Sequence, residues 1–176
     1  MICGIVVAKE NSNRFPNKNI YKYNNYPLFW HSVLPLIESD KIDKVYVSTD
    51  SLYIKEYCEK RGVSILWRGP NINSDKDPIF KVIKYAYQSM DQKFKICVSV
   101  MANCPGHTFS EVDKSIKILI KNDLNEVRSF DKNNLENGII VFNTRVFDTH
   151  DKISSYVGGV FTSGKEIHYK KELDDI

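Results

Sequence analysis

Ile2-Cys3-Gly4-Ile5-Val6-Val7-Ala8 opens the chain as a continuous apolar run that passes directly into a polar loop. Such a run predicts a strand that is buried on both faces, as in a parallel sheet. The loop that follows is Lys9-Glu10-Asn11-Ser12-Asn13-Arg14-Phe15-Pro16-Asn17-Lys18-Asn19. Ligands of open α/β sheets bind beyond the carboxyl ends of the strands. This loop is therefore the first candidate for a binding site.

Strand and helix patterns alternate along the rest of the chain. Helical spacing of apolar residues predicts a first helix from Pro27, in which Pro35 is expected to cause a kink or an early end. Lys121 to Asn137 is expected to be a solvated connection, and the tail from Val160 to Tyr169 is expected to hold one or two strands. Further strands are predicted at Val45–Ser48, Val63–Trp67, Phe94–Val100 and Gly138–Phe142, and further helices after Ser51, around Ile79–Tyr87 and from Ser110.

The alternation of strands and helices predicts a three-layer α/β/α fold with a mainly parallel, Rossmann-like sheet. We expect residues 1–176 to form a single domain, because this length suits one core and is short for two. The formal net charge of +3 gives no support for a nucleic-acid binder. No run approaches the roughly 20 apolar residues of a membrane helix.

The cysteine pattern and the amino-terminus predict a cytoplasmic protein. None of the four cysteines forms a CxxC pair, and we expect them to be small buried residues in a reducing compartment. No signal peptide pattern is present at the amino-terminus. The cysteines are Cys3, Cys58, Cys97 and Cys104.

The loop after Ala8 has the composition that a triphosphate requires. Lys9, Arg14 and Lys18 supply positive charge, Ser12 and several Asn residues supply neutral donors, and Pro16 fixes the backbone. It is neither a Walker loop nor a GxGxxG loop. On composition alone, an ordinary polar surface loop is an equally good interpretation.

The order of residues in this loop resembles the amino-terminal signature of the CMP-acylneuraminate synthetase family of cytidylyltransferases, roughly Ala-Arg-x-Gly/Asn-Ser-Lys-x-x-Pro-x-Lys-Asn. Three later stretches follow the order of the same family and continue the resemblance to about Asp77. They are Pro27-Leu28-Phe29-Trp30-His31-Ser32, Ile42-Asp43-Lys44-Val45-Tyr46-Val47-Ser48-Thr49-Asp50-Ser51, and Arg68-Gly69-Pro70 with Ser74-Asp75.

The resemblance implies a nucleotide-diphospho-sugar transferase-like fold and transfer of CMP from CTP to a sugar acid, with release of pyrophosphate and help from Mg²⁺. It implies catalytic roles for Lys9 and Lys18 and a possible homodimer. Asp50 and Asp75 could contact ribose or metal, although Asp50 could equally cap the following helix. The nucleotide-binding residues would be Ala8, Lys9, Asn11, Ser12, Arg14, Lys18, Asn19 and Arg68.

The chain also departs from the family pattern. Lys9 replaces an Arg, Asn13 replaces a Lys, and Met101 and His107 replace a Gln and an Arg. The segment between Ile120 and Gly138 is short where the family carries its dimerisation and sugar-contact segment.

The acidic pair that binds magnesium in the family is replaced by His168 and Lys170. These changes leave two alternatives open: a nucleotide-binding homologue without synthetase activity, or a sugar-nucleotide-using transferase. His107 and His168 each stand alone, which favours surface or hydrogen-bonded roles. Tyr21, Tyr23 and Tyr26 are expected to mark a packed loop.

Overall fold

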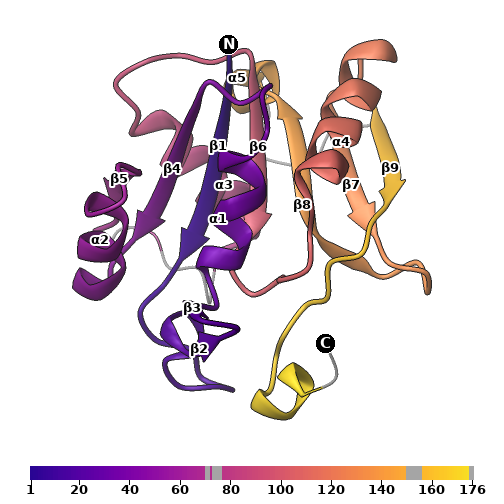
Figure 1. The fold of residues 1–176 in the computed structure, drawn as a ribbon. Coiled ribbons are helices and arrows are strands. Elements are labelled where there is room, and N and C mark those ends of the chain that lie inside the picture. The colour runs from indigo at the N-terminus through magenta and orange to yellow at the C-terminus, as the bar shows by residue number, and fades with distance from the viewer. Residues whose placement is uncertain (70–71, 73–76, 150–155, 175–176) are drawn as a thin grey trace.

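The computed structural model describes residues 1–69, 72, 77–149 and 156–174. Its main sheet has the strand order β5-β4-β1-β6-β8-β7-β9 (Figure 1). β1 (Ile2–Ala8) lies between β4 (Lys44–Thr49) and β6 (Ile96–Met101) and runs parallel to both, and β5 (Ser64–Trp67) runs parallel to β4. The predicted strand at the start of the chain therefore lies inside the parallel part of the sheet.

In the other half of the sheet one strand, β8 (Glu136–Asn143), runs against this direction, and β7 (Glu126–Phe130) and β9 (Val157–Phe161) run with it. β8 is antiparallel to both β6 and β7, and β9 is parallel to β7 at the edge. As a result, the carboxyl end of β6 lies beside the amino-terminal half of β8, where Val100 pairs with Ile139.

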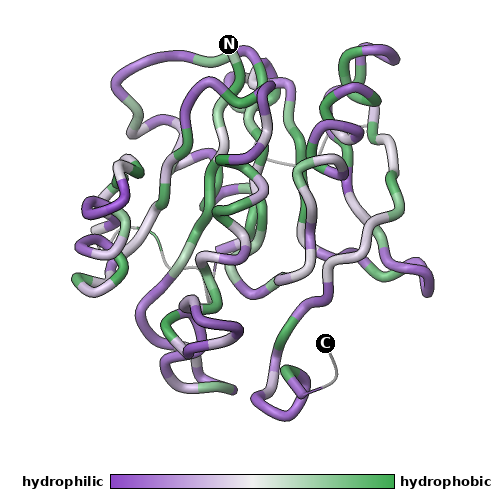
Figure 2. The backbone as a smooth tube through the Cα atoms, viewed as in Figure 1, coloured by the Kyte–Doolittle hydropathy of each residue, from purple (hydrophilic) through white to green (hydrophobic). Residues whose placement is uncertain are grey.

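Helices cover both faces of the sheet and complete the three predicted layers. Val6, Val47 and Val98 belong to the core on one face, beneath α1 (Trp30–Ile37), α2 (Leu52–Glu59) and α4 (Phe109–Lys121). The alternate positions Ile5 and Cys97 belong to a second core, beneath α3 (Ile79–Gln88) and α5 (Arg145–Thr149). Figure 2 shows hydrophobic residues concentrated along the central strands. This is the pattern of a sheet that is buried on both faces.

Most predicted elements are present, with boundaries that differ slightly. α1 ends at Ile37, shortly after Pro35, which agrees with the predicted early end. α4 begins at Phe109 rather than at Ser110, because Thr108 is its N-cap and accepts a hydrogen bond from the Glu111 backbone N–H. All four cysteines are free and buried, as predicted.

The prediction of a solvated connection from Lys121 to Asn137 is wrong, because the segment contains β7. The strand was missed because it carries Glu126 and Arg128, and charged residues are seldom buried unless they are paired. The Glu126 side chain is 1% exposed and accepts a hydrogen bond from Arg128, which also pairs with Glu136 on β8. β9 also begins earlier than the predicted strand in the tail.

A small hairpin and the carboxyl-terminal segment pack beside the first loop. β2 (Lys22–Tyr23) and β3 (Tyr26–Pro27) are joined at Asn24 and Asn25, both of which have positive φ, as tight two-residue hairpin turns require. Phe15 and Leu28 pack against Ile167 and against Leu173 of the 3-10 helix η2 (Lys170–Leu173), with Tyr21 and Tyr23 alongside. The predicted packed loop is thus confirmed for these two tyrosines. None of the helices in the described parts is long and apolar enough to cross a membrane.

Candidate functional site

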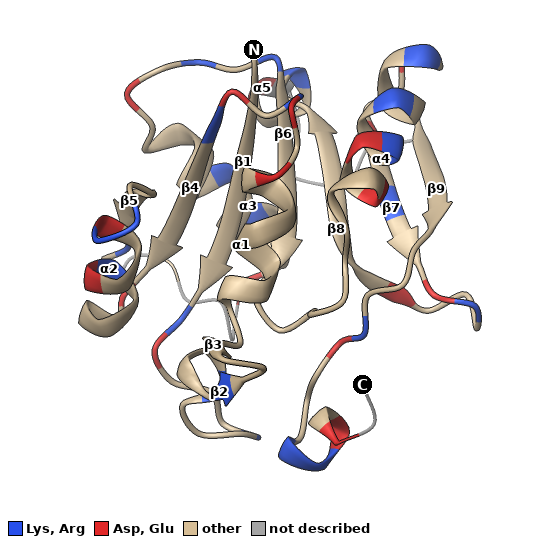
Figure 3. Ribbon diagram, viewed as in Figure 1, with Lys and Arg blue, Asp and Glu red and all other residues tan. Residues whose placement is uncertain are grey.

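A cavity of about 130 Å³ lies where β1 and β6 end. We call it the β1–β6 pocket. β1 and β6 carry no charged residues, so the charge at this edge comes from the loops that follow the strands (Figure 3). The pocket is lined by Val7, Lys9, Lys18, Asn19, Ile79, Ser99, Val100, Met101, Ala102 and Asn103.

The loop after β1 folds back so that both of its ends reach this pocket. Asn17 adopts the left-handed conformation, with φ of 57°, and starts the short 3-10 helix η1 (Lys18–Ile20). The Asn19 side-chain amide donates to the Lys9 carbonyl at 2.8 Å, which ties the two ends of the loop together. Phe15 anchors the middle of the loop in the small core beside Ile167. The cations are therefore held on a fixed backbone.

Lys18 connects the loop to the carboxyl-terminal segment. Its Nζ donates to the Ile167 carbonyl at 2.8 Å. Burial lowers the pKa of Lys18, the nearby Glu166 carboxylate opposes that effect, and the positive charge of Arg14 adds to it. Lys18 is thus a partly desolvated cation that faces a pocket, the kind of group that gains from contact with an anion.

A buried arginine forms a second cationic feature. The Arg68 backbone N–H donates to the Thr49 carbonyl at 2.8 Å, which fixes the residue beside the carboxyl end of β4. Its side chain is 2% exposed, and Nη2 lies 3.3 Å from Oδ1 of Asp50. Asp50 also accepts a hydrogen bond from the Glu10 backbone N–H, at 2.8 Å. This ion pair therefore links the end of β4 to the loop after β1.

The donors of Arg68 are unsatisfied. Its Nε, Nη1 and Nη2 atoms are all buried and have no hydrogen-bond partner in the described part of the chain. A buried cation with unpaired donors is costly unless an acceptor completes it. An incoming anion would supply that acceptor, and a guanidinium is suited to phosphate oxygens.

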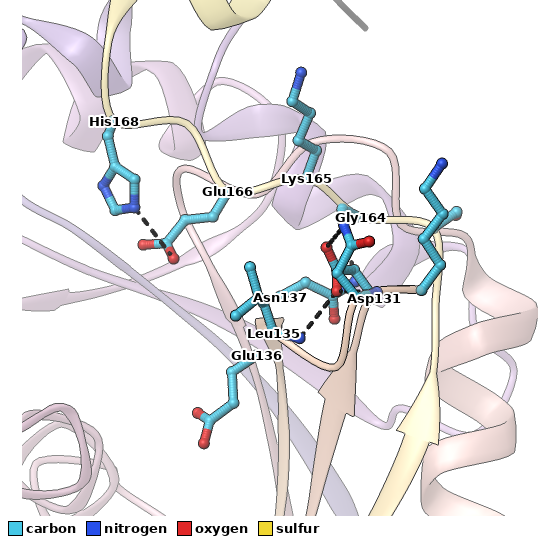
Figure 4. A pocket seen from close by; sticks show the side chains of 11 residues that line it. Asp131, Leu135, Glu136, Asn137, Gly164, Lys165, Glu166 and His168 are labelled. Atoms are coloured by element: carbon cyan, nitrogen blue, oxygen red, sulfur yellow. Dashed lines mark hydrogen bonds and ion pairs between the residues drawn. The ribbon is translucent and has the colours of Figure 1, made fainter.

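A second and larger cavity has a volume of about 580 Å³. We call it the hairpin pocket, because the turn between β7 and β8 forms one wall and the segment from Ser163 to His168 forms the other (Figure 4). Asn103 lines the β1–β6 pocket and donates to Glu166, which lines the hairpin pocket, at 3.2 Å. The two cavities therefore share a wall. The hairpin pocket is lined by Asp131, Lys132, Asn133, Leu135, Glu136, Asn137, Ser163, Gly164, Lys165, Glu166 and His168.

Buried hydrogen bonds hold the carboxyl-terminal wall in place. His107 Nε2 lies 2.7 Å from the Asn137 carbonyl, and the Asn137 side-chain amide donates to the Gly164 carbonyl at 2.9 Å. Glu111 accepts a hydrogen bond from the Ser163 backbone N–H, at 2.6 Å. His107 is therefore a hydrogen-bonded framework residue, in agreement with the interpretation favoured for it.

Burial would raise the pKa of Glu111. The nearby His107 ring, whose Nδ1 lies 3.7 Å from Oε2 of Glu111, and hydrogen bonds from the Thr108 and Ser163 backbone N–H groups outweigh that effect and lower the pKa to about 2. Glu111 is therefore a carboxylate at neutral pH, and its charge fixes the Ser163 end of the hairpin pocket.

The predicted site residues do not all come together. Lys9, Lys18 and Asn19 line the β1–β6 pocket, and Ala8 is buried at the end of β1. Arg68 and Asp50 form their ion pair next to Glu10. Three predicted residues lie on the loop outside the lining of both described pockets, and Asp75 lies outside the described residues. The three are Asn11, Ser12 and Arg14.

Glu166 was not predicted as a site residue. It belongs to no motif, and it reaches the site only because Asn103, 63 positions earlier in the chain, holds its carboxylate. Asn103 follows shortly after a predicted strand, where polar residues of α/β proteins meet ligands, whereas nothing in the local sequence marks Glu166.

The described residues do not build a preformed magnesium site. No group of three or more His, Cys, Asp or Glu side chains in the described ranges could hold a metal ion. Lys170 is turned toward the Tyr21 ring, with Nζ 5.3 Å from the ring centre, and His168 Nε2 lies 3.5 Å from Glu166. A lysine offers no oxygen ligand to Mg²⁺. The site as described therefore does not fit the metal.

A mainly parallel sheet with helices on both faces and a cationic loop at the carboxyl end of β1 is the architecture of α/β domains that bind ligands at this edge of the sheet. The family model described as Cytidylyltransferase matches residues 3–152. The chain belongs to this cytidylyltransferase family.

The similar proteins agree with this family. N-acylneuraminate cytidylyltransferase from Streptococcus agalactiae serotype V is 34% identical over 85 residues, which cover 47% of this chain and 20% of that protein. The match thus spans about a fifth of that relative's length.

Solved structures share the fold at low sequence identity. CMP:2-keto-3-deoxy-manno-octonic acid synthetase in complex with CTP superimposes with a TM-score of 0.78 at 11% identity, over 99% of this chain and 95% of that one. The manganese complex of Rv0371c from Mycobacterium tuberculosis gives 0.71 at 11% identity, over 99% and 96%. The predicted nucleotide-diphospho-sugar transferase-like fold is therefore confirmed.

Proposed function

We propose that the protein transfers CMP from CTP to the hydroxyl group of a sugar acid and releases pyrophosphate. The observation that carries this proposal is the fixed cationic loop at the end of β1, whose Lys9 and Lys18 line one pocket with Asn19. Membership of the cytidylyltransferase family and similarity to an N-acylneuraminate cytidylyltransferase support it.

In this proposal the loop binds the triphosphate. Lys9 and Lys18 neutralise the charge that develops on the leaving pyrophosphate, because phosphoryl-type transfer depends chiefly on positioning and electrostatic stabilisation. The unsatisfied donors of Arg68 bind phosphate oxygens. The remaining nucleotide contacts in the proposal come from Ala8, Asn11, Ser12, Arg14 and Asn19.

The hairpin pocket receives the acceptor. It adjoins the β1–β6 pocket through Asn103, so a sugar bound there can direct a hydroxyl at a phosphate held by the loop. The lining offers hydrogen-bonding groups of both charges, including Lys132, Lys165 and Glu166. Such a mixture suits a polyhydroxylated acid, whose carboxylate and hydroxyls need opposite partners.

Mg²⁺ remains part of the proposal only as a charge-neutralising partner of the bound nucleotide. A relative in the family fold was crystallised with manganese, which supports the use of a divalent metal, but the described side chains form no cluster for one and we derive no step through it. A single domain, a homodimer and a cytoplasmic location also belong to the proposal. The four free cysteines favour a reducing compartment.

An assay of pyrophosphate release tests the proposed function. The protein is incubated with CTP, Mg²⁺ and each member of a panel of sugar acids, with and without Lys18→Met. We expect release with at least one acid, and at least a tenfold lower rate in the variant. The control is Lys117→Met, an exposed position on α4 that lines neither pocket. Saturable CTP binding with no release for any acid would instead support a nucleotide-binding protein without synthetase activity.

A further inference from the structure

Among the described residues, two other carboxylates line the hairpin pocket and one lies at the end of β4, and each has hydrogen-bond or ion-pair partners away from the junction of the two cavities. Asp131 accepts hydrogen bonds from the Asn133 and Leu135 backbone N–H groups of the β7–β8 turn, at 2.8 and 2.9 Å. Glu136 accepts two bonds from the Arg128 guanidinium. Asp50 pairs with Arg68 and does not line either pocket.

Glu166 is placed differently. One oxygen of its carboxylate accepts from Asn103 Nδ2 at 3.2 Å, and the other lies 3.5 Å from His168 Nε2. The side chain is 30% exposed and lines the hairpin pocket (Figure 4). Asn103 itself lines the β1–β6 pocket, so the Glu166 carboxylate lies at the junction of the two cavities.

The backbone beneath Glu166 is fixed from both sides. The Ile167 N–H donates to the Asn103 carbonyl at 2.8 Å, and the Ile167 carbonyl accepts from Lys18 Nζ and from Asn103 Nδ2. The Lys165 N–H donates to the Pro105 carbonyl at 3.1 Å. A carboxylate held in this way keeps its position while substrates enter and leave, which is the requirement for a group that must meet a reacting atom.

We propose that Glu166 is the catalytic base that takes the proton from the acceptor hydroxyl, with Asn103 and His168 as positioning residues. The inference rests on the proposed function. The acceptor O–H bond breaks and its proton passes to the Glu166 carboxylate. The hydroxyl oxygen forms a bond to the α-phosphorus of CTP, and the bond from that phosphorus to the bridging oxygen of the β-phosphate breaks. Pyrophosphate leaves with the electron pair, and Glu166 later returns the proton to solvent.

Glu166→Gln separates this role from a structural one. The Gln oxygen can still accept from Asn103 Nδ2, so the carboxyl-terminal segment keeps its hydrogen bond while the proton acceptor is lost. We expect kcat to fall by about 10²–10⁴, the usual contribution of a general base, with the CTP dissociation constant changed less than threefold. The matched control is Glu38→Gln, an exposed carboxylate that follows α1 and lines neither pocket, which should leave kcat unchanged.

The pH dependence of kcat also distinguishes the two roles, because a purely structural role for Glu166 would leave it unchanged in Glu166→Gln. Among the described residues, the ionisable groups close enough to interact electrostatically with Glu166 include Lys18 on the loop, Cys104 in the turn after β6 and His168 on its own segment. The wild-type protein holds its own proton acceptor beside the substrate, so its turnover does not need hydroxide from the solvent. In Glu166→Gln that acceptor is lost, and kcat should rise with hydroxide concentration.

The outcomes of this experiment are distinct. The inference is supported if the wild-type protein turns over and Glu166→Gln has a much lower kcat that rises with hydroxide concentration. Wild-type turnover with equal kcat and the same pH profile in Glu166→Gln overturns the inference and leaves the proposed function intact. Absence of wild-type turnover with every sugar acid overturns the proposed function, and the inference falls with it.

Discussion

At the scale of single residues, Arg68 is the buried cation that most clearly lacks hydrogen-bond acceptors among the described residues. Its guanidinium is buried, and its one charged neighbour among the described residues is Asp50, at 3.3 Å. No hydrogen bond to its three nitrogens is present in the described residues. Removal of one partner of an ion pair is costly when the other charge stays buried, but the Asp50 side chain is 45% exposed and water can solvate it. We therefore propose a role in binding, rather than in folding, for this residue.

Arg68→Met should separate these two roles. We expect the CTP dissociation constant to rise at least tenfold, because phosphate oxygens lose a cationic donor, while the midpoint of thermal unfolding without nucleotide does not fall. Calorimetric titration and thermal denaturation of the same sample measure both. A lower unfolding midpoint together with unchanged CTP affinity would show that Arg68 is only a structural partner of Asp50.

Lys18 predicts a pH dependence of nucleotide binding. Burial lowers the pKa of Lys18 below its usual 10.5, so the amine loses its proton at a lower pH than an exposed lysine does. As the pH is raised, Lys18 should therefore lose its positive charge before pH 10.5 is reached, and the affinity for CTP should decline with it. In Lys18→Met that alkaline decline should be absent. An identical alkaline decline in both proteins would assign it to another group.

At the scale of elements, the start of α4 holds the wall of the hairpin pocket. Glu111 caps the helix together with Thr108 and also accepts from Ser163. The pKa of Glu111 falls from 4.5 to about 2 in the folded protein. A group with a lowered folded pKa contributes stability above its unfolded pKa and loses that contribution as the pH falls toward the folded one.

Glu111→Gln should accordingly lower the free energy of unfolding by roughly 2 kcal/mol at pH 7, a value already reduced for partial solvent exposure. The difference from the wild-type protein should be constant above about pH 5 and should shrink as the pH falls from 4.5 toward 2. Urea denaturation at a series of pH values measures it. A difference that did not change between pH 7 and pH 3 would contradict this account of the carboxylate.

A side chain added at Gly138, at the start of β8, should cause a steric clash, and Gly62 offers a matched control. Gly138 has φ of +108°, and a Cβ there would lie 2.6 Å from Sγ of Cys104. Gly62, after α2, has φ of +72° and open space around it. Gly62→Ala should cost about 1 kcal/mol of unfolding free energy, from the left-handed backbone alone. Gly138→Ala should cost roughly 2–4 kcal/mol, because strain and overpacking combine.

Denaturant unfolding of the two alanine variants tests this difference. Equal losses would mean that the turn after β6 yields to the added methyl group. A larger loss for Gly138→Ala would show that Cys104 and the start of β8 form one tightly packed unit beside the two pockets.

At the scale of the whole molecule, the sequence was most informative where structure depends on local pattern. The run from Ile2 to Ala8 predicted the central strand, because burial on both faces leaves a continuous apolar signature. β7 was missed because its buried Glu126 is neutralised by Arg128, a pairing that the local sequence presents only as charge. Glu166 was missed for a similar reason, since its partner Asn103 is remote in the chain.

Part of the candidate site was likewise predictable from the sequence, and part was not. Lys9, Lys18 and Asn19 were predicted from an ordered motif and line one pocket. The position of the hairpin pocket could not be predicted, because it depends on how β7, β8 and the carboxyl-terminal segment meet. Long-range hydrogen bonds through Asn137 and Ser163 fix that meeting, and no periodicity in the sequence encodes them.

The central claim is that the loop after β1 binds the triphosphate of CTP. Calorimetric titration with CTP in the presence of Mg²⁺ tests it most directly, with the wild-type protein, Lys18→Met and the surface control Lys117→Met measured side by side. The account predicts saturable binding by the wild-type protein and the control, and at least tenfold weaker binding by Lys18→Met. Equal affinities in all three proteins, or no binding by the wild-type protein, would contradict it.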